Sequence, residues 1–119
     1  MKKGMRKGDH AILLRIYIGE LDQYKGKPLW EAILYRAREL HLAGATVIHG
    51  VAGFGAASHL HTAKILRLSE DLPVLIEIVD TPENIDKIMP FLEEAVRDGM
   101  ITTEKVEIVK YVHSGKGKI

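Results

Sequence analysis

The stretch Val74-Leu-Ile-Glu-Ile-Val-Asp-Thr-Pro82 decides the fold because a β-strand ends and a helix begins within it. Its first seven residues are rich in β-branched side chains, which predicts a strand over Val74–Asp80. The next two suit the N-cap and the first helical position, where the missing N–H of proline costs nothing. Apolar residues then recur at helical spacing, so we expect a helix that closes at Gly99 and is kinked or split at Pro90.

Three further strands and one further helix surround this stretch. Alternation predicts a strand over Ala11–Ile18, and a polar, turn-like segment follows it. Pro28 then opens a helix whose apolar stripe ends before Gly44. The remaining strands are expected at Ala45–Gly50 and Val106–Val112.

The resulting order, β-α-β-β-α-β, defines the expected architecture. Two right-handed split β-α-β units give an α+β, ferredoxin-like sandwich, in which both helices cover one face of an antiparallel sheet. The side chains expected to face the helices are Ile12, Leu14, Ile16, Val74, Ile76, Ile78, Val106 and Ile108.

The opposite sheet face mixes large apolar groups with charges. A sheet face in water should be mostly polar, so we expect another copy of the chain to cover this one. Arg15 is then expected to pair with Glu77 or Glu107, across the sheet or between subunits. A monomer with a large exposed apolar patch is the alternative. By alternation the face presents Leu13, Arg15, Tyr17, Leu75, Glu77, Val79, Glu107, Val109 and Tyr111.

Composition sets the broad class. The chain has 119 residues, of which 46% are hydrophobic, as expected for a single domain. A net charge of +1 disfavours nucleic acid as a partner, and the lack of Cys excludes disulfides and thiolate metal sites. The apolar runs are too short to span a membrane, and no signal peptide is visible, so we expect a cytoplasmic protein.

The charge is distributed unevenly. Four basic residues in the first eight and two in the last six leave −5 on residues 9–113. We therefore divide the chain into a basic tail over residues 1–10, a domain over 11–113 and a C-terminal tail over 114–119. Solvated tails are the ordinary explanation for such ends, and a weak anionic partner is the alternative.

A long loop between the second and third strands, residues 51–73, carries the most suggestive residues. Its glycine-rich start, Gly50–Ser58, can present several backbone N–H groups to an anion, although such a stretch is more often a mobile tip. Nearby, His49, His59 and His61 supply donors for an alternative metal site. No nucleophile elbow or catalytic triad pattern is present, so we expect no enzyme and no catalytic residue.

Motifs along the chain add a family resemblance. Gly44–Val47 followed by Gly53-Phe54-Gly55 resembles the second-strand segment of PII nitrogen-signalling proteins. From about Ile12 to Val112 the chain is more similar still to an uncharacterised PII-like family of bacteria and archaea. The motifs that carry this similarity are Arg15–Glu20, Gly26–Trp30, Ala43–Val47, Gly53–Gly55, Leu68–Pro73, Glu77–Asp80 and Asp98–Thr102.

The resemblance implies a ferredoxin-like homotrimer whose sheets pack inward, with an adenine nucleotide held between subunits. It implies that Thr46, Gly53, Phe54 and Gly55 line this cleft, and that Gly99 and Lys105 lie near the phosphates. The segment Asp98–Lys105 lacks two glycines and a lysine of the PII pattern, so a monophosphate such as AMP, or no nucleotide at all, is favoured over ATP.

The leading hypothesis is therefore a non-enzymatic PII-like regulator that requires no cofactor, takes an adenine nucleotide as its ligand and contacts a partner protein through the loop after the second strand. A membrane transporter or channel is one kind of partner that fits. A trimeric divalent-metal-tolerance protein using His49, His59 or His61 is the first alternative. A ligand-independent interaction scaffold is the second.

Overall fold

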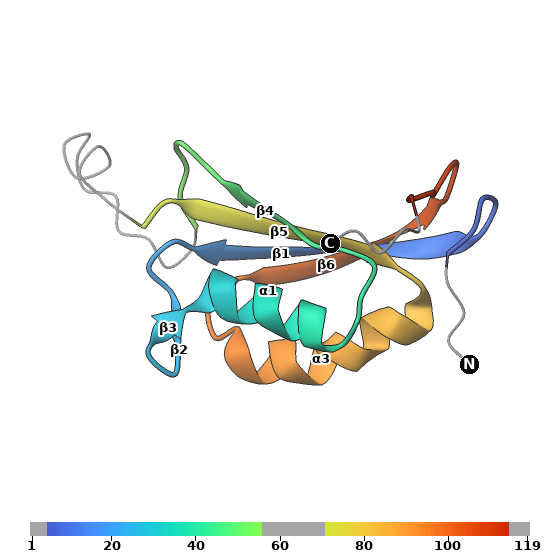
Figure 1. Ribbon diagram of the computed structural model, residues 1–119. Coiled ribbons are helices and arrows are strands. Elements are labelled where there is room, and N and C mark those ends of the chain that lie inside the picture. Colours follow the sequence, from blue (N-terminus) through green and yellow to red (C-terminus); the bar gives the residue numbers. More distant parts are fainter. Residues whose placement is uncertain (1–4, 56–70, 115–119) are drawn as a thin grey trace.

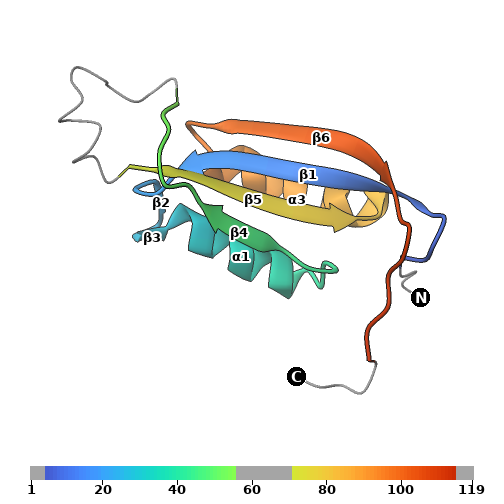
Figure 2. The same cartoon turned by 90° about the horizontal axis from the view of Figure 1, so that it is seen from above.

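The computed structural model describes residues 5–55 and 71–114. Within them the elements are β1 (His10–Gly19), β2 (Gln23–Tyr24), β3 (Lys27–Pro28), α1 (Leu29–Glu39), β4 (Thr46–His49), β5 (Pro73–Asp80), α3 (Pro82–Ala95) and β6 (Met100–Glu107). The main sheet is antiparallel, in the order β4-β5-β1-β6. Both helices lie against one face of it and the other face is open (Figures 1 and 2). The predicted ferredoxin-like α+β fold is confirmed.

The central strand β1 organises the sheet, because it pairs along most of its length with β5 on one side and β6 on the other. Its alternation sends Leu14, Ile16 and Ile18 toward the helices, where all three are buried. They join the apolar stripes of the two helices. The rest of this buried cluster is Leu29, Ile33, Ala37, Val74, Ile76, Ile78, Ile85, Ile88, Leu92 and Ala95.

The start of α3 follows the predicted capping chemistry. The Thr81 hydroxyl accepts a hydrogen bond from the Asn84 N–H (3.2 Å), and Pro82 is the first helical residue. Pro90 lies inside the helix, but α3 runs from Pro82 to Ala95 without being split and ends before Gly99. Packing of the apolar face onto the sheet offsets the hydrogen bond that Pro90 cannot donate.

The buried carboxylate of Asp80 joins three parts of the chain. Its oxygens accept hydrogen bonds from the N–H groups of Ala43 (2.6 Å) and Thr81 (2.7 Å), and from the side-chain amide of Asn84 (2.9 Å). The residue is only 1% exposed. It therefore ties the connection between α1 and β4 to the beginning of α3.

The last strand differs from the sequence prediction. The structure places it at Met100–Glu107, not at Val106–Val112. Pairing with β1 decides this register, and an edge strand tolerates the polar run Thr102–Lys105 because only one of its sides is paired. Val106 consequently lies opposite Ala11 on the open face, so its assignment to the helix-facing side was wrong.

Ile108 was also assigned wrongly to the helix side. It is buried in a second, small apolar cluster with Met5 and Ala11. Residues 5–9 form a turn that holds this cluster closed: the Gly8 N–H donates to the Ile108 carbonyl (2.7 Å), and the Ile108 N–H donates to the Asp9 carbonyl (2.9 Å). The part of the basic N-terminal tail that the structure describes is thus packed against the domain.

The polar segment after β1 forms the short β2–β3 hairpin, which the sequence predicted only as a turn. The Tyr24 ring packs edge-on against Phe91 of α3, with 5.1 Å between ring centroids. No helix in the described part of the chain is long and apolar enough to cross a membrane.

Candidate functional site

The glycine-rich loop lies at the end of the sheet where β4 stops and β5 starts. The Gly50 N–H donates to the Pro73 carbonyl (2.7 Å), which keeps the first loop residues close to β5. Gly53 has a φ of +145°, and a Cβ there would come within 2.9 Å of the Pro73 ring, so the tight approach requires glycine. Phe54 beside it is 68% exposed. The loop therefore presents an aromatic ring and backbone groups at the surface.

His49, the last residue of β4, is held in place on the helix side of the sheet. Its Nδ1 lies 2.7 Å from the Glu20 carboxylate, and its ring packs edge-on against Trp30 at 5.1 Å between centroids. Both partners lie in motifs that carried the family resemblance, but the sequence did not link either of them to His49. The pair fixes the end of β4 next to the loop.

Carboxylates surround the end of β1 at the same end of the sheet. The Asp22 carboxylate accepts a hydrogen bond from the Gly19 N–H (2.9 Å), and the Asp71 carboxylate accepts one from the Leu21 N–H (3.0 Å). Partial burial raises the pKa of Asp22, and the nearby charges of Asp71 and Asp98 raise it further, although the Gly19 hydrogen bond opposes this. The local potential here is negative, a feature that the sequence did not predict.

The two residues expected near phosphates lie on the β6 side of the sheet. Gly99 immediately precedes β6 with a φ of +150°, and a Cβ at this position would collide with the Tyr17 carbonyl oxygen. Lys105 lies inside β6, opposite Ile12 of β1, and is exposed. The expected loop over Asp98–Lys105 is therefore a strand from Met100 onward, with Lys105 about 20 Å along it from Gly99.

Thr46, the remaining predicted ligand residue, opens β4 and is exposed opposite Glu77. It shares the β4 side of the sheet with the glycine loop. The six predicted residues thus fall into two groups at opposite edges of one sheet. The strand order separates these edges by three strand spacings, about 14 Å.

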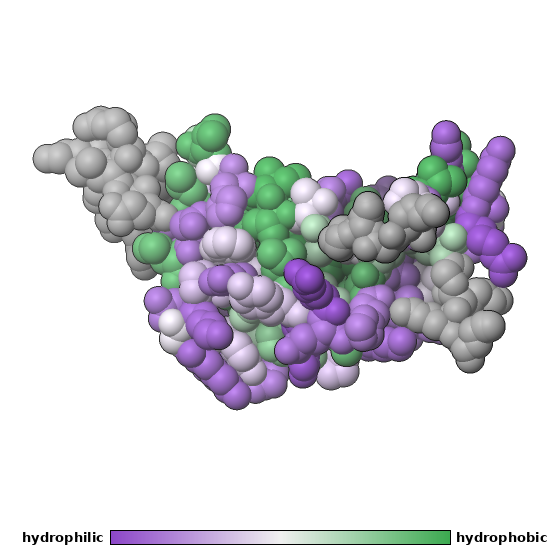
Figure 3. Space-filling model, in the orientation of Figure 1, coloured by the Kyte–Doolittle hydropathy of each residue, from purple (hydrophilic) through white to green (hydrophobic). Residues whose placement is uncertain are grey.

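Apolar side chains gather on the open face of the sheet. Hydrophobic residues follow the sheet side of the molecule, while hydrophilic residues cover the outer surface of the helices (Figure 3). Register places Leu13 and Tyr17 of β1, Leu75 of β5 and Met100 of β6 on the open face. All four are partly or largely exposed. The open face is thus more apolar than a sheet surface in water should be.

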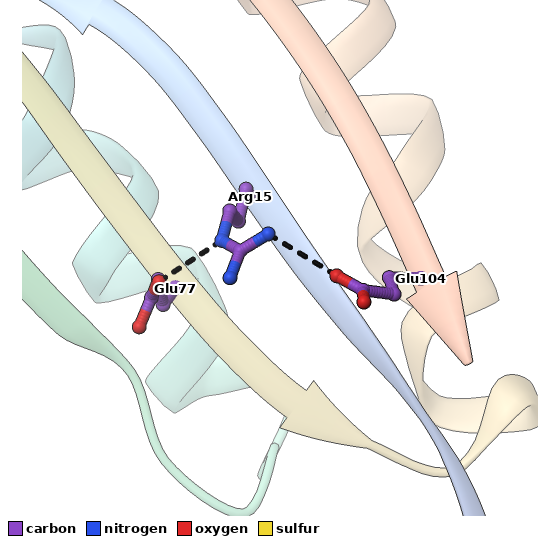
Figure 4. A network of polar contacts seen from close by, with 3 residues as sticks. All are labelled: Arg15, Glu77 and Glu104. Atoms are coloured by element: carbon purple, nitrogen blue, oxygen red, sulfur yellow. Dashed lines mark hydrogen bonds and ion pairs between the residues drawn. The ribbon is translucent and has the colours of Figure 1, made fainter. Parts of the chain in front are cut away.

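A polar cluster lies at the centre of this face. Arg15 of β1 donates from Nε to Glu77 of β5 (3.1 Å) and from Nη1 to Glu104 of β6 (3.2 Å) (Figure 4). The pairing with Glu77 was predicted, whereas Glu104 takes the place expected for Glu107 because of the shifted last strand. The hydrogen bond with Glu77 is the main reason that the pKa of Arg15 is raised.

The predicted metal site is not supported by the described residues. Among residues 5–55 and 71–114, no group of three His, Asp or Glu side chains is arranged to hold a metal ion. His49 is paired with Glu20 and packed on Trp30. His59 and His61, the other two predicted donors, lie outside the described residues.

The fold is shared with solved structures of PII-like proteins. One from Thermus thermophilus, described as a PII-like signaling protein, has a TM-score of 0.61 and 17% identity, covering 87% of this chain and 93% of that one. CPII of Thiomonas intermedia K12, a nitrogen regulatory PII-like protein bound to ADP, AMP and bicarbonate, has a TM-score of 0.54 and 13% identity, covering 89% and 100%. The architecture is therefore that of the PII-like fold.

Residues 11–108 match the DUF190 family, described as Uncharacterized ACR, COG1993, and the chain belongs to that family. A UPF0166 protein of Aquifex aeolicus (strain VF5) is 41% identical over 99 residues, which cover 82% of this chain and 91% of that protein. The family resemblance seen in the motifs is confirmed.

Proposed function

We propose that this protein is a non-enzymatic PII-like regulator that works as a homotrimer and binds an adenine nucleotide between neighbouring subunits. The observation that carries the proposal is that the residues predicted to bind the nucleotide are divided between the two edges of one sheet. Thr46 and Gly53–Gly55 lie on the β4 side, and Gly99 lies at the start of β6. One chain cannot close these groups around a single ligand, but the edges of two adjacent chains can form the two walls of a cleft.

The charges at this end of the sheet favour AMP over ATP. Three carboxylates, of Asp22, Asp71 and Asp98, lie near Gly99, and after burial, which is the main cause, the charges of the latter two also raise the pKa of Asp22. Lys105, the one basic residue among those predicted to bind the nucleotide, lies opposite Ile12 and thus far along β6 from Gly99. A monophosphate carries fewer negative charges than a triphosphate, so it meets less repulsion in such a site.

The proposed signal passes through the loop over residues 51–73. Val51 and Phe54 are already exposed where it leaves β4, so a ligand bound against Gly53–Gly55 would touch the base of the loop directly. Binding would change the surface that the loop presents to a partner protein, for which a membrane transporter or channel is one candidate. The ligand controls this contact without any chemical step.

Calorimetry of the purified protein against AMP, ADP, ATP and cyclic AMP tests the proposal. We expect binding with AMP favoured over ATP and with one site per pair of neighbouring subunits. Phe54→Ala should weaken binding about tenfold if the exposed ring stacks on the base. Val51→Ala is the matched control, because Val51 is also exposed in the same loop but outside the proposed site.

Heat of binding for none of the four nucleotides at millimolar concentration would contradict the nucleotide site and favour a ligand-independent scaffold. Equal weakening by Phe54→Ala and Val51→Ala would contradict the placement of the base beside Phe54.

A further inference from the structure

The described residues after β6 have the composition of a strand but form none. Residues 109–113, here called the C-terminal arm, belong to no helix or strand of the described structure. Val109 is 75% exposed, Val112 72% and Tyr111 39%. β-branched and aromatic residues in such density are typical of strands that pair and bury one face. The arm therefore has the properties of a strand without a partner.

The geometry of the sheet leaves little of the arm to pair with the free edge of its own chain. β6 and β4 form opposite edges, so the arm would have to cross three strand spacings, about 14 Å. An extended chain spans at most about 3.5 Å per residue, so the crossing uses about four of the five residues of the arm. Figure 2 shows the arm crossing the end of the sheet and continuing outward on the β4 side. Residues 109–113 would then keep about one residue for pairing with their own β4, whereas the edge of another molecule could pair with the whole arm.

The outer edge of β4 is the better receptor of the two sheet edges. Edge strands are usually protected from pairing by charged residues or proline. β6 carries Glu104, Lys105 and Glu107, whereas β4, Thr46–His49, carries no Lys, Arg, Asp, Glu or Pro. Ile48 in its middle is 45% exposed. The β4 edge is short, with four residues, but it lacks the charged residues and proline that keep a second strand away.

An apolar groove lies beside the residues that precede this edge. It has a volume of about 300 Å³ and lies between the outer side of α1 and the residues that lead into β4. Its lining includes Leu34, Tyr35, Leu42 and Ala45. Strand addition commonly combines main-chain hydrogen bonds at an edge with pockets for alternate side chains. The β4 edge and the groove together offer both.

We propose that the C-terminal arm of one subunit adds as a strand to the outer edge of β4 in a neighbouring subunit, with alternate arm side chains entering the groove. The contact joins two different surfaces of the chain, so it is complete for every copy only in a closed ring. This inference rests on the homotrimer of the proposed function, which supplies such a ring, but it does not depend on the nucleotide. The arm would be the strap that closes the ring.

Because the chain contains no Cys, engineered thiols test the contact cleanly. Ala45→Cys places a thiol beside β4, and Lys110→Cys places one on the arm without removing its apolar side chains. The two variants, differently tagged, are co-expressed and treated with a short flexible bis-maleimide. Linked dimers that contain both tags are expected from the mixture and none from either variant alone. A double variant should give covalent trimers on a denaturing gel.

Each other outcome overturns the inference in a distinct way. Dimers from Lys110→Cys alone would show that arms pair with each other. If light scattering shows a trimer but no sample gives cross-links, the arm contact is ruled out, while the proposed function is not contradicted. A monomeric wild-type protein would overturn the trimer itself, while calorimetry would still decide separately whether a nucleotide binds.

A second variant measures how much the contact contributes. Tyr111→Pro removes one N–H donor from the arm and should leave the fold of the single chain intact, because the arm is in no strand there. We expect the trimer to dissociate at a protein concentration at least about tenfold higher than for wild type. Lys110→Ala is the control and should leave this dissociation concentration unchanged. An unchanged dissociation of Tyr111→Pro would overturn the proposal.

Discussion

The two faces of one sheet show how differently neighbouring residues of a strand can be used. On β1, Ile16 faces the helices and is 0% exposed, whereas Tyr17 faces outward and is 37% exposed. The polar groups differ as well, since Asp80 is buried with three donors while Arg15 forms ion pairs in partial contact with water. The helix face is completed by the chain itself. The open face has the apolar character of an interior but lacks a cover among the described residues, which is why assembly is central to the proposed function.

The largest effect on stability is expected at Ile16 of β1, and its neighbour Tyr17 should behave differently. Ile16→Ala should lower the free energy of unfolding by about 4 kcal/mol, because it leaves a cavity in a fully buried cluster. Tyr17→Ala should lower the free energy of unfolding of each chain much less, but it should reduce the mass of the oligomer in solution. Urea unfolding and light scattering measure the two quantities. A small loss of stability in Tyr17→Ala with no change in assembled mass would mean that the open face is an ordinary solvated surface.

The next largest effect concerns the polar group of the helix face. Asp80→Ala should destabilise the protein by about 3 kcal/mol, since the N–H groups of Ala43 and Thr81 and the amide of Asn84 lose their acceptor. Asp80→Asn retains one acceptor oxygen and should be intermediate. Thermal unfolding of the two variants provides the measurement, and a loss in Asp80→Ala no greater than that of an exposed substitution would refute the linking role.

A smaller effect is expected for the corresponding group of the open face. Arg15→Met removes the contacts to Glu77 and Glu104, both of which are partly exposed, so the loss of stability should be less than for Asp80→Ala. Because the pairs are accessible to solvent, the difference from wild type should shrink between low salt and about 1 M salt. A loss of stability that does not depend on salt would indicate that another chain already covers the cluster in solution.

The smallest effect is a pH dependence at the acidic end of the sheet. The pKa of Asp22 is raised in the folded state, so the folded protein binds this proton more tightly than the unfolded chain does. The stability that this proton contributes is present at low pH and is lost as pH rises through the raised pKa. Asp22→Asn should therefore be slightly more stable than wild type at pH 7, and the gain should vanish below about pH 4. A variant that is less stable at pH 7 would contradict the sign.

The sequence predicted what local patterns encode. The strand over Val74–Asp80 and the helix start at Thr81 were correct because alternation, β-branched residues and capping chemistry all act within a few residues. The last strand was misplaced because the segment after residue 106 has a better strand composition than Thr102–Lys105, and only pairing with β1 selects the polar segment.

The candidate site shows the same division between local and distant effects. Gly53 and His49 stand out by residue type alone. The contact of His49 with Glu20 and the proximity of Asp22 to Asp71 join residues far apart in the chain, so no local pattern could indicate them. The acidic character of this end of the sheet became visible only with the fold.

The central position of β1 also has a consequence for how the protein is made. Its strand partners run from Pro73, opposite Gly19, to Glu107, opposite His10, so every one of them is synthesised long after β1 itself. A newly made N-terminal half holds an apolar strand with no edge to pair with. Contacts between such distant segments slow folding, and they leave apolar surface open to other nascent chains in the meantime. Correct folding of this small domain therefore waits until β6, Met100–Glu107, has emerged from the ribosome.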